Sequence, residues 1–210
     1  MTLVAFDFDG TLSDSEMTVL LGEQLGVADE MERITERAMN DEIEYAESLR
    51  ERCALLAGLP EESAQEAFDQ VTLRPGADDV VDALADAGVS TAILTGGFER
   101  GVQTALSREG VQVETVIANR LPVEDGELTG EVEGPLIEGT KDDALDVLTT
   151  VLGERETVAV GDGANDLPML RAAGLAIGFD PKPAVAPHCD VVVESMDELL
   201  DVLAERGVLE

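Results

Sequence analysis

Four polar segments of this sequence combine residue types that suit phosphoryl transfer. Asp7 and Asp9 directly follow an apolar run, and residues 161–166 (GDGAND) follow a later apolar run. Residues 95–97 (TGG) and Lys141 lie between these two segments. Transfer of a phosphoryl group requires a nucleophile, a cation beside the phosphate oxygens and a proton donor for the leaving oxygen. Together the four segments offer groups for each of these tasks.

The paired acids Asp7 and Asp9 can divide two of the tasks. Alternate side chains of a strand point to opposite faces, but a turn at Gly10 would let both carboxylates reach one ligand. We expect Asp7 to attack the phosphorus atom and form an aspartyl-phosphate. We expect Asp9 to protonate the leaving oxygen and then to deprotonate the hydrolytic water, which suits a carboxyl group whose pKa is raised by a nearby acid.

The other polar groups predict a phosphate cradle and a magnesium site. The hydroxyl group of Thr95, the backbone N–H groups of the glycines that follow it and the ammonium of Lys141 would hold the phosphate oxygens. The sequence has no cluster of histidine or cysteine residues that would favour zinc. Magnesium prefers oxygen ligands, and the candidates are Asp7, the backbone carbonyl of Asp9, Asp162 and the nearby Asp166.

The order of apolar and amphipathic segments predicts an α/β fold. Apolar runs typical of strands buried on both faces occur at residues 3–8, 90–94, 116–118, 158–160, 176–179 and 191–193. Amphipathic stretches with a helical period lie at residues 77–87, 100–108, 142–152 and 196–205. This alternation predicts a Rossmann-like parallel sheet with helices on both faces. Ligands of such sheets bind beyond the carboxyl ends of the strands, where the polar segments are expected.

Two segments interrupt the alternation. Residues 15–74 contain successive helical patterns and no strand pattern, which predicts a helical cap inserted after the first strand. The catalytic core would then comprise residues 1–14 and 75–210. Residues 121–132 contain two short alternating segments around Asp125-Gly126, which predicts a small β-hairpin insertion.

The charge of the chain excludes several classes of partner. Its 46 acidic and 13 basic residues give a net charge of −33, which disfavours binding to nucleic acid or to an anionic membrane surface. The acids are spread along the whole chain, so their mutual repulsion would be screened in molar salt. No secretory signal or membrane-spanning run is evident. We therefore expect a protein of a salt-loving cytoplasm.

Lysine is almost eliminated from the sequence. The basic residues are 11 arginines and two lysines, Lys141 and Lys182. In such a composition each retained lysine is expected to have a specific role. Cys53 and Cys189 lack the spacing of a zinc or redox site, and we expect both to be small buried side chains.

In their order along the chain, these motifs resemble those of the haloacid dehalogenase superfamily. The matching segments are residues 7–11 (DFDGT), residues 95–97, Lys141 and residues 161–166, and the resemblance covers almost the entire chain. Cap residues 34–39 and 48–52 and hairpin-region residues 118–121 and 126–130 are most similar to the phosphoserine phosphatases. The resemblance implies a magnesium-dependent phosphomonoesterase that hydrolyses L-phosphoserine in serine biosynthesis.

The resemblance also implies a role for each site residue. Asp7 would be the nucleophile and Asp9 the acid and base, while Glu16 would bind the ammonium of serine and Arg52 its carboxylate. Thr95, Gly96 and Lys141 would bind the phosphate, Asp7, the Asp9 carbonyl and Asp162 would bind magnesium, and Asn165 and Asp166 would complete the site.

Two departures leave the substrate open. Gly10 and Thr95 stand where the phosphoserine phosphatases more typically carry serine. Another small phosphate ester, such as a sugar phosphate or phosphoglycolate, is an alternative substrate. A non-catalytic module that binds metal or phosphate, and phosphotransfer to an acceptor alcohol, are alternative functions. The sequence does not determine the oligomeric state.

Overall fold

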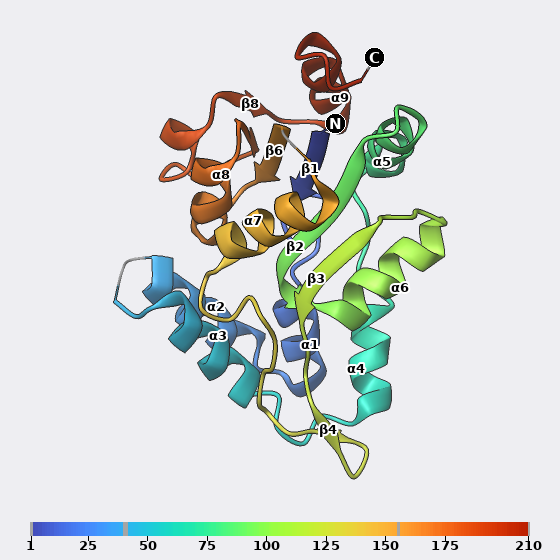
Figure 1. Ribbon diagram of the computed structural model, residues 1–210. Helices are drawn as coiled ribbons and strands as arrows, with labels where there is room; N and C mark the ends of the chain where they lie inside the picture. Colours follow the sequence, from blue (N-terminus) through green and yellow to red (C-terminus); the bar gives the residue numbers. More distant parts are fainter. Residues whose placement is uncertain (1, 40–41, 155, 210) are drawn as a thin grey trace.

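The predicted α/β fold is confirmed by a computed structural model, which describes residues 2–39, 42–154 and 156–209. Its centre is a parallel sheet of six strands in the order β3-β2-β1-β6-β7-β8 (Figure 1). The strands are β1 (Thr2–Phe6), β2 (Ser90–Phe98), β3 (Thr115–Asn119), β6 (Glu156–Gly161), β7 (Leu175–Phe179) and β8 (Val191–Val193). The central strand β1 is buried on both faces, which explains why its sequence is a nearly continuous apolar run.

Helices cover both faces of the sheet because side chains alternate along each strand. On β1, Val4 and Phe6 belong to a hydrophobic cluster with residues of α5, α6 and α9, whereas Leu3 and Ala5 belong to a second cluster with α7 and α8. These helices are α5 (Ala77–Asp86), α6 (Glu99–Glu109), α7 (Lys141–Leu152), α8 (Leu167–Ala172) and α9 (Met196–Glu205). Two short 3₁₀ helices, η1 (Ala164–Asp166) and η2 (Ala186–His188), complete the C-terminal half.

Helices also make up the segment between β1 and α5. They are α1 (Met17–Leu25), α2 (Ala28–Met39), α3 (Tyr45–Ala54) and α4 (Glu61–Phe68). Leu21 of α1 and Leu49 of α3 belong to the same hydrophobic cluster as Val4 and Phe6 of β1, so this segment packs on the sheet through a continuous core. Within the described ranges, no helix is both long and apolar enough to cross a membrane.

The predicted hairpin is present and joins the core to the helical segment. Strands β4 (Val123–Glu124) and β5 (Glu127–Leu128) pair antiparallel, and both turn residues, Asp125 and Gly126, have positive φ angles of 53° and 85°. The backbone of Leu128 donates to the Leu59 carbonyl at 2.8 Å and accepts from Gly58 at 2.9 Å. The hairpin is therefore hydrogen-bonded to the loop between α3 and α4.

Two strand ends differ from the prediction. Strand β1 ends at Phe6, because the chain turns from Phe8 onward, where the Phe8 carbonyl accepts from both Thr11 and Ser13. Strand β2 continues to Phe98 and includes residues 95–97, which lie beyond the predicted strand at residues 90–94. The pairing of β2 with β3 shifts register between Leu94 and Phe98, so the added part of the strand is irregular.

The hairpin offers a test of core packing. Leu128 is 3% exposed, whereas its cross-strand partner Val123 is 38% exposed. We expect Leu128→Ala to lower the free energy of unfolding by about 2–4 kcal/mol, because it leaves a cavity in the hydrophobic cluster to which Leu128 belongs. Val123→Ala should change it by less than about 1 kcal/mol. Denaturant unfolding in molar salt measures both, and equal losses would contradict this account of the hairpin.

Candidate active site

The carboxyl ends of the central strands border a large cavity. Asp7 follows β1 and Asp162 follows β6, while Thr95 and Gly96 lie in the last part of β2. The cavity has a volume of about 850 Å³. The sequence-predicted residues on its wall are Asp7, Asp9, Glu16, Arg52, Thr95, Gly96, Asp162 and Asn165.

The remaining predicted residues, Lys141 and Asp166, lie buried beside Asp7. The Nζ atom of Lys141 lies 2.6 Å from Oδ1 of Asp7 and 2.5 Å from Oδ1 of Asp166. The Lys141 side chain is 2% exposed and that of Asp166 is fully buried. A buried ammonium is tolerated only when it is paired and hydrogen-bonded, so these three side chains form one interdependent unit.

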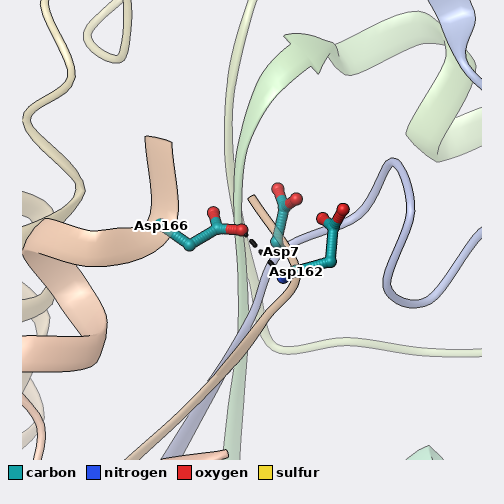
Figure 2. Close-up of side chains that lie close together, drawn as sticks. All are labelled: Asp7, Asp162 and Asp166. Carbon is teal, nitrogen blue, oxygen red and sulfur yellow. Dashed lines mark hydrogen bonds between the residues drawn. The ribbon is translucent and has the colours of Figure 1, made fainter. Parts of the chain in front are cut away.

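Asp166 organises the loop that follows β6. Its Oδ2 atom accepts a hydrogen bond from the backbone N–H group of Asp162 at 3.0 Å (Figure 2). The same oxygen accepts from the backbone N–H group of Gly163 at 2.9 Å. Because its other oxygen accepts from Lys141, both carboxylate oxygens of Asp166 are engaged. Asp166 therefore orients both the lysine and the backbone that carries Asp162.

Three carboxylates fit a divalent cation. One oxygen atom from each of Asp7, Asp162 and Asp166 lies within 4.8 Å of the others, and all three residues are buried (Figure 2). An all-oxygen donor set suits a hard cation such as Mg²⁺. Asp9 follows Asp7 by two residues. Its Oδ1 atom is buried without a hydrogen-bond partner among the described residues.

Burial raises the pKa values of the carboxyl groups in the site. It raises the pKa of Asp7 to about 8, an effect that Asp166 increases and Lys141 opposes. Burial, with the nearby charge of Glu16, holds the pKa of Asp9 well above its usual range. Burial also raises the pKa of Asp162 to about 6. A protonated Asp9 is suited to donate to a leaving oxygen, while a cation beside Asp7 and Asp162 would favour their ionised forms.

Gly96 presents its backbone to the cavity because its neighbours leave no room for a side chain. A Cβ atom at Gly96 would collide with the hydroxyl group of Tyr45, which enters the site from α3. The carbonyl of Gly96 accepts from Nδ2 of Asn119 at 3.0 Å, and the Thr95 hydroxyl accepts from the Gly97 N–H at 2.9 Å. No role was assigned to Asn119 from the sequence. The feature that could have indicated one is its position, because it is a polar residue directly after a predicted strand.

The departure at Gly10 has a structural reason. Gly10 adopts a φ of +86°, and a Cβ atom there would lie 2.9 Å from the carboxylate of Asp162. A side chain at this position would therefore be strained and would press on the cluster of carboxylates. This geometry explains why position 10 of this chain is glycine, although the phosphoserine phosphatases more typically carry serine there.

The proposed serine-binding residues lie on the side of the cavity formed by the helical segment. Glu16 precedes α1 and is exposed. Arg52, on α3, donates from Nη1 to the hydroxyl group of Thr18 at 3.1 Å. Its Nη2 group makes no hydrogen bond within the described part of the chain. Asn165 lies in η1 and also lines the cavity.

Known proteins resemble this chain over most of its length. The family model of the haloacid dehalogenase-like hydrolases matches residues 4–171. A curated relative from Halobacterium salinarum, named phosphoserine phosphatase, is 57% identical over 210 residues that cover 99% of this chain and 100% of the relative. Two solved structures, a phospho-aspartyl intermediate analogue of phosphoserine phosphatase and a substrate-bound phosphoserine phosphatase complex, each have 36% identity and a TM-score of 0.89. Each alignment covers 95% of this chain and 97% of the solved one, and the resemblance inferred from the motifs is confirmed.

The charge of Asp162 should destabilise the protein when no divalent cation is present. Folding raises the pKa of Asp162 from 3.8 to about 6, so the unfolded state releases this proton first as the pH rises. The resulting destabilisation is absent below about pH 4 and complete above about pH 6. With a chelator present, we expect Asp162→Asn to have a higher Tm than the wild type at about pH 7.5, and the difference to close toward pH 4.

Calorimetry across this pH range in molar potassium chloride measures the effect. Asp201→Asn, which removes an exposed carboxylate from α9, is the matched control and should show no pH-dependent gain. A Tm of Asp162→Asn below that of the wild type at about pH 7.5 would contradict the destabilising role of this charge.

Proposed function

We propose that this chain, which belongs to the haloacid dehalogenase-like hydrolase family, hydrolyses L-phosphoserine to L-serine and phosphate. The observation that carries the proposal is the buried unit of Asp7, Lys141 and Asp166 at the edge of a cavity that also contains Arg52. The full-length similarity to the phosphoserine phosphatase of Halobacterium salinarum supports the same substrate.

In the first step Asp7 is the nucleophile. A carboxylate oxygen of Asp7 forms a bond to phosphorus while the bond between phosphorus and the serine oxygen breaks, which gives an aspartyl-phosphate. Lys141, held 2.6 Å from Asp7, orients this carboxylate and favours its ionised form, as a cation bound at the site would. Asp9, whose pKa is raised, donates its proton to the departing serine oxygen.

In the second step the aspartyl-phosphate is hydrolysed. Asp9, now ionised, accepts a proton from water as the water oxygen bonds to phosphorus and the bond to Asp7 breaks. Phosphate is released, and Asp7 and Asp9 return to their starting states. Thr95 and the backbone of Gly96 lie on the same cavity wall as Asp7 and are the groups that would hold the phosphate oxygens.

A divalent cation fits the site and we propose that it is Mg²⁺. Asp7, Asp162 and the backbone carbonyl of Asp9 would hold it, with Asp166 orienting the loop that carries Asp162. When bound, it would supply positive charge beside the phosphate oxygens and lower the repulsion between phosphate and the carboxylate of Asp7.

The substrate's amino-acid part is assigned to the opposite side of the cavity. The guanidinium of Arg52 matches a carboxylate in shape and charge, and the carboxylate of Glu16 can pair with an ammonium. We place this activity in serine biosynthesis, in a cytoplasm rich in salt. The net charge of −33 and the similarity to a protein of Halobacterium salinarum support that setting.

The nucleophile is tested with Asp7→Asn. This variant keeps the size of the side chain but removes the attacking oxygen's charge, so we expect kcat for phosphoserine to fall at least about a thousandfold. Phosphate release with Mg²⁺ in molar potassium chloride measures it. Asp143→Asn, at an exposed position of α7, is the control and should retain full activity. Substantial turnover by Asp7→Asn would remove Asp7 from the nucleophilic role.

Substrate choice is tested with two arginines of the same helix. We expect Arg52→Ala to raise KM for phosphoserine about tenfold or more and to leave an aryl phosphate, which has no amino-acid carboxylate, almost unaffected. Arg50→Ala should affect neither substrate, because Arg50 is exposed and pairs with Glu138. If Arg52→Ala impairs both esters equally, or if the wild type prefers phosphoglycolate or a sugar phosphate, the serine assignment is wrong.

A further inference from the structure

Lys182 is the second of the two lysines in this chain, and the reaction described above assigns it no role. It lies in the loop after β7, between Pro181 and Pro183. Its backbone N–H donates to the carbonyl of Asp162 at 2.9 Å, and its own carbonyl accepts from Val185 at 2.8 Å. Prolines on both sides and these hydrogen bonds fix the backbone, so the side chain starts from a defined position.

The side chain of Lys182 reaches the cluster formed by the carboxylates of Asp7, Asp162 and Asp166. Its Nζ atom lies 3.3 Å from Oδ2 of Asp162, one of the three clustered carboxylates. The Asp162 side chain is 12% exposed and that of Lys182 is 42% exposed. Lys182 therefore differs from Lys141: it contacts the cluster from the cavity and retains freedom to move.

The cavity is otherwise strongly acidic. Of the described residues that line it, Arg52 and Lys182 carry positive charge, because Lys141 is buried and already paired with two acids. The acidic lining residues are Asp7, Asp9, Glu16, Glu32, Glu36, Glu44 and Asp162. A phosphate ester entering this cavity meets repulsion unless a cation lies close to its path.

We propose that Lys182 is an exchangeable cation that links metal binding to anion binding. Without metal, its ammonium neutralises Asp162. A divalent cation bound at the cluster would repel the ammonium and replace it beside the carboxylate of Asp162. The side chain of Lys182 would then be free to pair with the anionic substrate. The inference rests on the proposed function, because it assumes that a divalent cation and a phosphate ester share this site.

The exchange predicts opposite effects on two ligands. Without Lys182 the metal meets no competing ammonium at Asp162 among the described residues, whereas the phosphate has lost a partner. We therefore expect Lys182→Gln to bind Mg²⁺ alone about three- to tenfold more tightly than the wild type, and the Mg²⁺-loaded variant to bind inorganic phosphate about three- to tenfold more weakly. Lys182→Arg, which keeps the charge, should restore both affinities toward the wild-type values.

Isothermal titration of the full chain in molar potassium chloride measures both affinities without turnover. Molar salt limits the electrostatic influence of a charge on ligand binding to contacts of a few ångströms. Arg206→Gln, which removes an exposed positive charge at the end of α9, is the control. Arg206→Gln should change neither affinity. The same shifts in this control would mean a general charge effect and would overturn the proposal.

The remaining outcomes separate this inference from the proposed function. Weaker or unchanged Mg²⁺ binding by Lys182→Gln, in a background where the wild type binds Mg²⁺ and hydrolyses phosphoserine, overturns the exchange alone. Unchanged phosphate binding overturns the pairing with the substrate. A wild type that binds no Mg²⁺ and releases no phosphate overturns the proposed function and the exchange with it.

Discussion

The site depends on one buried contact, in which the ammonium of Lys141 lies between the carboxylates of Asp7 and Asp166. Lys141 begins α7, and the N-terminal end of a helix disfavours a positive charge, so local preference does not explain this residue. The two acids compensate for that cost, and the charge of the lysine in turn offsets part of the rise that burial causes in the pKa of Asp7. Removing Lys141 leaves two buried carboxyl groups without a counter-charge, and for this reason stability and chemistry are inseparable here.

The topology of the sheet makes this contact possible. Strand β1 lies between β2 and β6, and all three run parallel, so their carboxyl ends meet at one edge. Asp7 therefore comes close to the loop carrying Asp162 and Asp166, although more than 150 residues separate them in sequence. The helical segment enters between β1 and β2 and adds Arg52 from a different side of the cavity. Core and helical segment thus contribute different chemistry, the first suited to phosphate and the second to the rest of a substrate.

The sequence predicted the sheet, both insertions and the acidic motifs, because each has a local signature of apolar period, turn residues or spacing. The end of β2 was missed, since Gly96 and Gly97 have no side chains to carry a strand pattern. Asn119 was missed because its role is a contact with the Gly96 carbonyl, which is 23 residues away and depends on strand pairing. The retention of Lys182 was visible in the composition, but its contact with Asp162 required the fold. Roles carried over from the family, such as that of Arg52, remain predictions.

Salt screens the charges on the surface of this chain more strongly than the buried charges of the site. In about 1 M salt the screening length is roughly 3 Å, so repulsion among the dispersed surface acids of this chain is suppressed. Lys141 contacts Asp7 and Asp166 inside that length and away from solvent, so salt barely weakens these pairs. The pair of Lys182 and Asp162 is partly exposed and lies at the limit of this range, at 3.3 Å. A highly acidic chain can therefore depend on salt for its folded state while the charges that act on phosphate remain governed by direct contact.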